Sequence, residues 1–244
     1  MSATIDYTLH LADNALILAQ RNAEWCGHGP VLEQDIAITN ITLDLVGQAR
    51  SFYQYAASLL GDGATEDSLA YLRTEREFKN CLLMEQPRGD WAQTILRQFF
   101  TSAYQFYLYQ YLQQYPNKQL SAIAEKSIKE VSYHLRWSSE WVIRLGDGTE
   151  ESHQRVRHAL EELWPFTGEL FTAAAYEQEL GIDLTSIQSS WLLKIKTVLE
   201  EATLPLPHST YMQQGGKNGI HSEAMGFLLT DLQYLQRVYP GCEL

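Results

Sequence analysis

Apolar residues recur every three or four positions over long stretches of this chain, and the alternating pattern typical of strands is nearly absent. This spacing is that of an α-helix with one buried face. It predicts four long helices in the first two thirds of the chain, at about residues 7–25, 32–60, 90–114 and 120–145. Shorter helices are expected at about 68–83, after Thr149, at about 185–202 and at about 222–238, with breaks at glycine or proline.

One hydrophobic core can accommodate a chain of 244 residues. No internal repeat, low-complexity tract or linker divides it. We therefore expect a single all-α domain over residues 1–244. Its core bundle covers about 6–146, and a helical C-terminal extension follows over about 149–244.

Charge and composition exclude several classes of function. The net charge is −12, whereas nucleic-acid and anionic membrane surfaces attract proteins with a surplus of Lys and Arg. No apolar run approaches the roughly 20 residues that span a bilayer. The residues near the start include acidic ones, whereas a signal peptide begins with basic residues, so export is not expected. The three cysteines, Cys26, Cys81 and Cys242, form no CxxC pair. A cytoplasmic protein with reduced thiols is expected.

Four-helix bundles that bind two iron ions carry one Glu on each of two helices and a Glu-x-x-His pair on each of the other two. The nearest approach to such a pair is at His134, but the residue three positions earlier is Val131, which cannot bind iron. The only strict Glu-x-x-His sequence, Glu150 to His153, follows Gly148 and is typical of a solvated helix start.

The other ligand positions of such a bundle are also poorly filled. Asp44 could replace one Glu, but Gly47, three residues later, offers no ligand, and the central polar residues of the first and third long helices are amides. We therefore predict no catalytic, cofactor-binding or metal-binding residue in this chain. Asp44 and His134 are expected in a buried hydrogen-bonded or charge-paired cluster, because burying either group alone is costly. The predicted vestigial ligand positions are Gln20, Asp44, Gly47, Gln98, Val131 and His134.

Two further features leave alternatives open. The third long helix and the last helix are rich in aromatic and apolar residues on more than one face, which fits either a subunit interface or internal burial. The loop Gly215–Gly219 is expected to be flexible. It is more typical of a hinge or turn than of a phosphate-binding loop.

Four stretches of the chain resemble one protein family. They are Asn14–Glu33, which contains RNAEWCGH; Asn40–Ala49, NITLDLVGQA; Lys126–Leu135, KSIKEVSYHL; and Gly215–Gly241, GGKNGIHSEAMGFLLTDLQYLQRVYPG. In these the chain resembles the C subunits of bacterial phenylacetyl-CoA epoxidases, which are multicomponent oxygenases of aerobic phenylacetate degradation. The resemblance spans nearly the whole chain.

The resemblance implies a ferritin-like four-helix bundle with additional C-terminal helices. It also implies a catalytic A subunit that holds the di-iron centre, and a reductase subunit that carries FAD and a 2Fe-2S cluster and takes electrons from NADPH. The C subunit has no cofactor of its own and pairs with A as a structural partner. The replacements at Gly47 and Val131 agree with this implication.

We therefore expect a non-catalytic subunit that stabilises and positions the A subunit, binds other subunits of the complex, and forms homodimers or aggregates when alone. Two alternatives remain. One is a degenerate metal-binding oxidase that uses Asp44 and His134. The other is a self-assembling helical bundle without an oxygenase partner.

Overall fold

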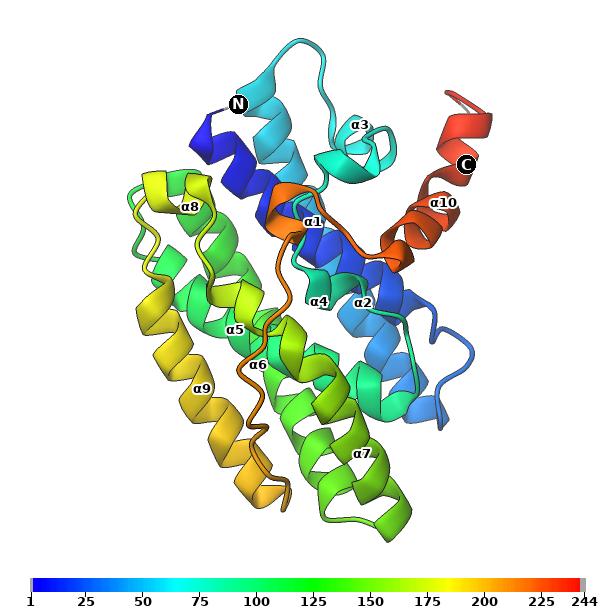
Figure 1. Cartoon of the computed structure of the whole chain (residues 1–244). Coiled ribbons are helices and arrows are strands. Elements are labelled where there is room, and N and C mark those ends of the chain that lie inside the picture. Colours follow the sequence, from blue (N-terminus) through cyan, green and yellow to red (C-terminus); the bar gives the residue numbers. More distant parts are fainter. Residues whose placement is uncertain (1, 242–244) are drawn as a thin grey trace. The chain divides into compact units, whose positions relative to one another are not determined.

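The computed structural model describes residues 2–241, and all regular structure in this range is helical (Figure 1). The α-helices are α1 (Ala3–Ala23), α2 (Leu32–Leu60), α3 (Glu66–Tyr71), α4 (Leu82–Glu85), α5 (Trp91–Leu112), α6 (Lys118–Gly146), α7 (Glu150–Leu163), α8 (Ala175–Glu179), α9 (Leu184–Glu201) and α10 (Glu223–Val238). Short 3-10 helices are η1 (Glu75–Glu77), η2 (Trp164–Phe166), η3 (Gly168–Phe171) and η4 (Gly216–Asn218). The predicted all-α class is confirmed, and the long helices are consistent with a ferritin-like bundle.

The chain forms two compact units, each of which contains a pair of long helices. Unit 1 comprises the described residues up to Pro87, together with Ala174–Gly181 and those from Gly215 onward. Unit 2 comprises Arg88–Ala173 and Ile182–Gln214. No helix in residues 2–241 is both long enough and apolar enough to cross a membrane. Cys26 is exposed, Cys81 is buried and both are free thiols, while Cys242 lies outside the described residues.

In unit 1, α1 and α2 are joined by a short turn and pack along each other. Ser2 caps α1 by accepting a hydrogen bond from the backbone N–H of Ile5. The helix is buried nearly all around, although one of its faces is polar. The buried polar residues of α1 are Thr8, His10, Asp13, Asn14, Arg21 and Asn22. Burying these groups requires partners for each, and those of Asp13, Asn14 and Arg21 include segments far along the chain.

The predicted helix over about 68–83 is wrong, because the chain is helical there only in α3, η1 and α4. The segment between α3 and α4, which we call the open segment, is held out of a continuous helix by side chains of α1. The carboxylate of Asp13 accepts the backbone N–H of Lys79 at 2.8 Å, and the side-chain oxygen of Asn14 accepts that of Cys81 at 2.8 Å. These acceptors replace the carbonyls that a continuous helix would have supplied.

The predicted flexibility of Gly215–Gly219 is also wrong, since η4 packs tightly against this open segment. A Cβ atom on Gly216 would lie 2.2 Å from the carbonyl oxygen of Asn80, and one on Gly219 would lie 2.2 Å from that of Arg76. Gly219 also has a φ of 76°, which favours glycine. Lys217, in the same loop, is buried. The glycines therefore allow two backbones to approach closely.

In unit 2, α5 and α6 form the second long pair, and α7 and α9 pack against them. Asp90 caps α5 and Asn117 caps α6. The helix expected after Thr149 is α7, which Thr149 caps, and it ends where Pro165 enters η2. The helix expected at about 185–202 is α9, and Asp183 caps it by accepting a hydrogen bond from the backbone N–H of Ser186 at 3.1 Å.

We expect Gly216→Ala to lower the free energy of unfolding by about 1–3 kcal/mol, because the added methyl group must displace the backbone at Asn80. Urea denaturation of both variants measures this. Gly47→Ala is the matched control, because a Cβ there meets nothing within 4 Å on an exposed helical surface. It should leave stability unchanged or raise it by up to about 1 kcal/mol. Equal midpoints for Gly216→Ala and the parent protein would contradict the packing argument.

Candidate functional site

The six predicted vestigial positions fall on four helices of the two units. In unit 1, Gln20 and Asp44 are partly exposed and Gly47 is exposed; in unit 2, Gln98, Val131 and His134 are buried. The side-chain amide of Gln98 donates to the hydroxyl of Ser102 at 2.8 Å. Among residues 2–241, no group of three or more His, Cys, Asp or Glu side chains is placed to hold a metal ion. The assignment of these positions as former ligands stays a prediction.

The largest cluster of buried polar groups lies along α1 in unit 1. We call it the α1 polar seam, and it has three parts, centred on Asp13, Glu85 and Glu177. Its members on α1 recur at helical spacing and therefore share one face. They are His10, Asp13, Asn14 and Arg21. The pattern of apolar positions alone does not predict this face. The helical spacing of its polar residues is nevertheless present in the sequence.

Asp13 is the centre of the first part of the seam. Its carboxylate forms an ion pair with the guanidinium of Arg73 and accepts the hydroxyl of Tyr53 at 2.6 Å. Arg73 also donates to the carbonyls of Leu69 and Glu77. Burial raises the pKa of Tyr53, and the nearby Asp13 charge raises it further, so the phenol stays protonated. Burial is the largest single effect and lowers the pKa of Arg73, but the charge and hydrogen bond of Asp13, together with contributions from Tyr53 and Glu77, raise it by more. Arg73 therefore keeps its positive charge inside the protein.

Glu85 joins α4 to the C-terminal arm, by which we mean residues 215–238. One of its oxygens lies 2.7 Å from Nδ1 of His221, and the other accepts the backbone N–H of Ser222 at 2.6 Å. Nε2 of His221 lies 3.0 Å from the carbonyl oxygen of Phe78. Because both imidazole nitrogens face acceptors, the ring carries two protons and a positive charge. Arg21 donates to the carbonyls of Glu85 and Ala224, which ties α1 to the same arm.

The pKa of His221 is raised above its ordinary value. Burial is the largest single effect and acts to lower it, whereas the hydrogen bond and the charge of Glu85 act to raise it. The hydrogen bond to the Phe78 carbonyl and the charge of Glu75 act in the same direction.

Glu177 forms the third part and ties α8 to the arm. It binds the ammonium group of Lys217 at 2.9 and 3.0 Å and accepts the backbone N–H of Ala174 at 2.8 Å. His10 lies beside it, with Nδ1 2.7 Å from the carbonyl of Lys79. Burial, followed by the charge of Lys217, lowers the pKa of His10 to about 4. His10 is therefore neutral near pH 7. Lys217 is occupied by Glu177, which argues against phosphate binding in this loop.

The α1 polar seam is an enclosed network of paired groups. The side chains of Asp13, Glu85, Glu177, His10 and His221 are fully inaccessible to solvent. General acid–base catalysis requires a group that can reach a substrate proton. The groups at the centres of the seam are instead bound to one another and to main-chain atoms. The seam fastens distant segments of unit 1 together.

The exposed surface of α2 carries a row of apolar side chains. Leu32, Ile36, Leu43 and Val46 are exposed and project from one side of the helix, since their spacing repeats in steps of three, four and seven residues. We call them the α2 stripe. Leu43 is 64% exposed, and Gly47 beside it leaves the surface flat. The sequence analysis did not single out this face.

A pocket of about 180 Å³ adjoins the C-terminal end of the α2 stripe, between α2 and α3. Val46 lies on its border, together with Arg50 and Glu66, which form an ion pair at 3.4 Å. A pocket beside an apolar stripe can accept an anchoring side chain from a partner.

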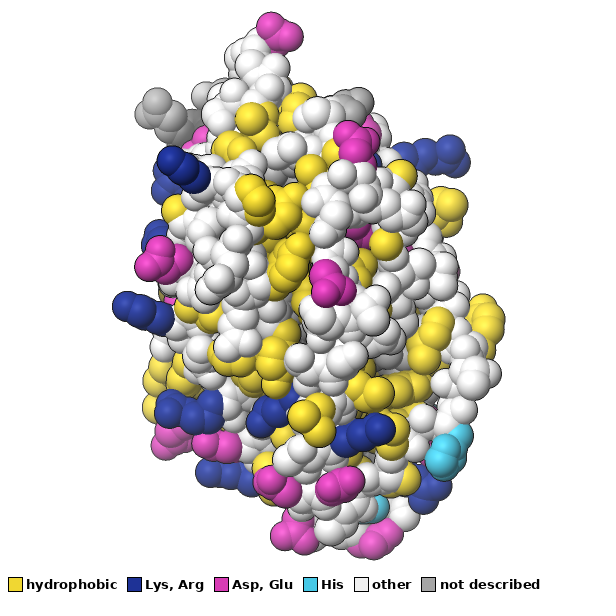
Figure 2. Space-filling model, turned by 90° about the vertical axis from the view of Figure 1, so that its left-hand side faces the viewer, with side chains coloured by type: hydrophobic (Ala, Val, Ile, Leu, Met, Phe, Trp, Pro, Cys, Tyr) yellow, Lys and Arg dark blue, Asp and Glu magenta, His cyan; other side chains and the backbone are white. Residues whose placement is uncertain are grey.

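Single exposed apolar residues are common on any protein surface. Figure 2 shows one face of the molecule on which hydrophobic side chains lie among charged ones of both signs. The α2 stripe differs because its members are aligned along one helix. The aromatic excess predicted for the third long helix is largely internal, since Phe99, Phe100, Tyr104 and Tyr109 of α5 are buried. The last helix does expose apolar residues.

The fold and the seam define an all-helical protein, consistent with a ferritin-like bundle, in which buried ion pairs fasten the interior of unit 1. The profile of the family described as "Phenylacetic acid catabolic protein" matches residues 1–243, and the chain belongs to this family. It is 47% identical over 246 residues to the Escherichia coli (strain K12) protein named as the C subunit of 1,2-phenylacetyl-CoA epoxidase, covering 99% of each chain. The resemblance inferred from the four sequence stretches is thereby confirmed.

We expect the His221–Glu85 pair to make stability depend on pH. Because the folded pKa of His221 is raised, its contribution is complete below about pH 6.5 and is lost as the pH rises through the folded value. His221→Asn should lower stability by about 1.5–3 kcal/mol at pH 6 and by less at pH 9. Thermal unfolding across this range measures the difference. His208→Asn, at an exposed position, is the control. A gap that is the same at both pH values would show that His221 does not change its protonation state between pH 6 and pH 9.

Proposed function

We propose that this chain is a non-catalytic structural subunit of a phenylacetyl-CoA 1,2-epoxidase, and that it pairs with and stabilises the di-iron A subunit. Family membership and the name of the E. coli relative support the assignment to such a complex. The α2 stripe is the observation that carries the pairing, because a row of exposed leucine, isoleucine and valine on a long helix is suited to covering by another helix.

The proposed partner surface follows from the geometry of α2. Leu32 and Val46 are 14 residues apart, which is about 21 Å along a helix. This length is enough for several layers of side-chain packing with one partner helix. The adjoining pocket at Val46 would receive an anchor side chain at one end of the stripe.

The proposed division of labour places chemistry in other chains. The A subunit would hold the di-iron centre, and a reductase subunit with FAD and a 2Fe-2S cluster would deliver electrons from NADPH. Gly47 is exposed and Val131 is apolar, so neither supplies a ligand. The seam groups that could in principle bind a metal are enclosed and are bound to Arg73, Lys217 and main-chain atoms. These features favour the structural role over a degenerate oxidase that uses Asp44 and His134.

The pairing is tested by substituting one residue of the α2 stripe. We expect Leu43→Glu to weaken binding of the cognate A subunit by at least about 30-fold, because a central apolar anchor is worth about 2 kcal/mol or more. Calorimetry or sedimentation of the mixed full-length chains measures the affinity. Leu193→Glu is the matched control, since Leu193 is a 69% exposed leucine on α9 in unit 2. If Leu43→Glu binds A as tightly as the parent chain does, α2 is not part of the interface. If the wild-type chain does not bind the A subunit, the proposed pairing is refuted.

The protein purified alone should contain no stoichiometric iron. The expectation follows from the missing ligands at Gly47 and Val131, because tight iron binding requires several converging carboxylate or imidazole groups. Elemental analysis after expression in iron-rich medium measures the content. About one or more tightly bound iron ions per chain, lost in His134→Ala, would instead support the oxidase alternative.

A further inference from the structure

The C-terminal arm is a peripheral part of unit 1. Its helix α10 packs mainly on α3, η1 and α4, which are short elements in and beside the open segment. Met225, Leu228 and Leu229 form the buried face of α10, whereas Phe227 on its outer face is 68% exposed. The chain enters the arm from residues 204–214, which contain no helix. A helix placed in this way can open locally while the rest of the unit stays folded.

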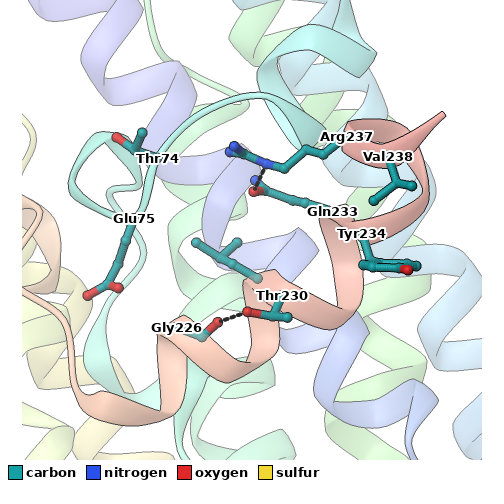
Figure 3. Close-up of a pocket in the computed structure, with 9 residues that line it drawn as sticks. Thr74, Glu75, Gly226, Thr230, Gln233, Tyr234, Arg237 and Val238 are labelled. Atoms are coloured by element: carbon teal, nitrogen blue, oxygen red, sulfur yellow. Dashed lines mark hydrogen bonds between the residues drawn. The ribbon is translucent and has the colours of Figure 1, made fainter. Parts of the chain in front are cut away.

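A pocket of about 410 Å³ lies between α10 and η1 (Figure 3). Glu75 of η1 lies on one side of this pocket, and Gln233 and Arg237 of α10 lie on the other. The packing of α10 on η1 is therefore incomplete along this side, and the helix buries less apolar surface than a fully covered one. The attachment of the arm consequently depends also on its polar anchors.

Polar anchors hold the arm at both ends. At the far end, the Gln233 amide donates to two main-chain carbonyls of unit 1. At the start, Lys217 forms an ion pair with Glu177. Four residues later, His221 forms one with Glu85. Only histidine among these side-chain types has an ordinary pKa near neutral pH, so His221 is the anchor whose charge a change of pH can remove.

The surroundings of His221 favour a charged ring while the arm is closed. Both ring nitrogens face acceptors, namely the Glu85 carboxylate on α4 and the Phe78 carbonyl in the open segment. Glu75 of η1 adds a second negative charge nearby. The Glu85 side chain is fully buried, and it also accepts the Asn80 amide at 2.9 Å.

Loss of the proton would disfavour the closed arm for two reasons. One ring nitrogen would direct its lone pair at an acceptor, and the buried Glu85 carboxylate would lose the cation bound to it. Arg21 of α1 is the neighbouring cation, and it donates to the main-chain carbonyls of Glu85 and Ala224. Opening the arm would relieve both costs, because it separates the two side chains and admits water to the carboxylate.

We propose that His221 is a proton-controlled latch, which fastens the C-terminal arm to α4 when its ring is charged and lets the arm open as a unit when the proton is lost. In the open arm the ring is in water and releases its proton at about pH 6.5, whereas the closed arm holds the proton more tightly. The closed arm is therefore most stable below about pH 6.5 and weakens as the pH rises above it. Unit 1 then presents the outer face of α10 in place only while the latch is closed.

Amide hydrogen exchange of the full chain tests the latch, because it reports opening segment by segment. After correction for intrinsic exchange rates, the protection of arm amides should fall severalfold between pH 6 and pH 9. The fall should not exceed about tenfold per pH unit, because one proton is released. The amides of α1 and α2 should stay more protected than those of the arm at both pH values. Low urea should change arm protection little, since local opening exposes less surface than unfolding does.

Two variants separate the proton from the general attachment of the arm. His221→Asn should lower arm protection by about tenfold or more at pH 6 and by less at pH 9, because a hydrogen bond to a charged group is lost only where the ring is charged. Gln233→Ala is the matched control, because it removes an uncharged anchor of the same arm. It should lower arm protection by the same factor at both pH values.

Two results would overturn the latch. Arm amides that share one protection factor with those of α1 and α2 would show that the arm does not open by itself. Arm protection that is the same at pH 6 and pH 9 in the parent chain, or that His221→Asn lowers equally at both, would show that the proton does not control it. If His221→Asn does not fold, the pH dependence in the parent chain and in Gln233→Ala still decides the proposal.

Discussion

The carboxylate of Asp13 is the interaction on which unit 1 depends. Placing a charge inside a protein costs several kcal/mol unless it is paired and hydrogen-bonded. Asp13 meets this requirement by binding Arg73, Tyr53 and the backbone N–H of Lys79. Satisfying it draws the chain after α3 out of helical conformation and lays it along α1. The open segment then presents its own carbonyls to whatever packs next.

The C-terminal arm packs on that segment. The position of the arm therefore depends on the open segment, which in turn depends on α1. Glycines at 216 and 219 allow the arm to approach the backbone at Asn80 and Arg76. Lys217 and His221 then pair with the buried acids Glu177 and Glu85. Each of these two pairs joins residues 40 or more positions apart, so neither would form without the rest of the unit. The result is a fixed platform from which α10 presents its outer face.

An interior of this kind favours a protein that acts through its surface. The acidic and basic groups of the seam are paired with one another. The exposed surface includes apolar helical faces on α2 and on α10. Both surfaces suit protein partners, which supports the proposed role as a subunit that holds other chains in place. The pKa shifts agree with this pairing. His221 is charged near the Glu85 carboxylate, and His10 is neutral near the Lys217 ammonium group.

The sequence by itself determined the helical class, the extents of the long helices and the family, because periodicity and end signals are local and the family motifs are contiguous. It also revealed that Gly47 and Val131 cannot bind metal. Tertiary structure alone decided the break of the helix predicted over 68–83, since Asp13 and Asn14 supply hydrogen bonds from α1. It likewise decided that η4 is packed rather than flexible, that the aromatic residues of α5 are largely internal, and that α2 is exposed. Burial and pairing depend on segments distant in the chain, and no local pattern encodes which segments meet.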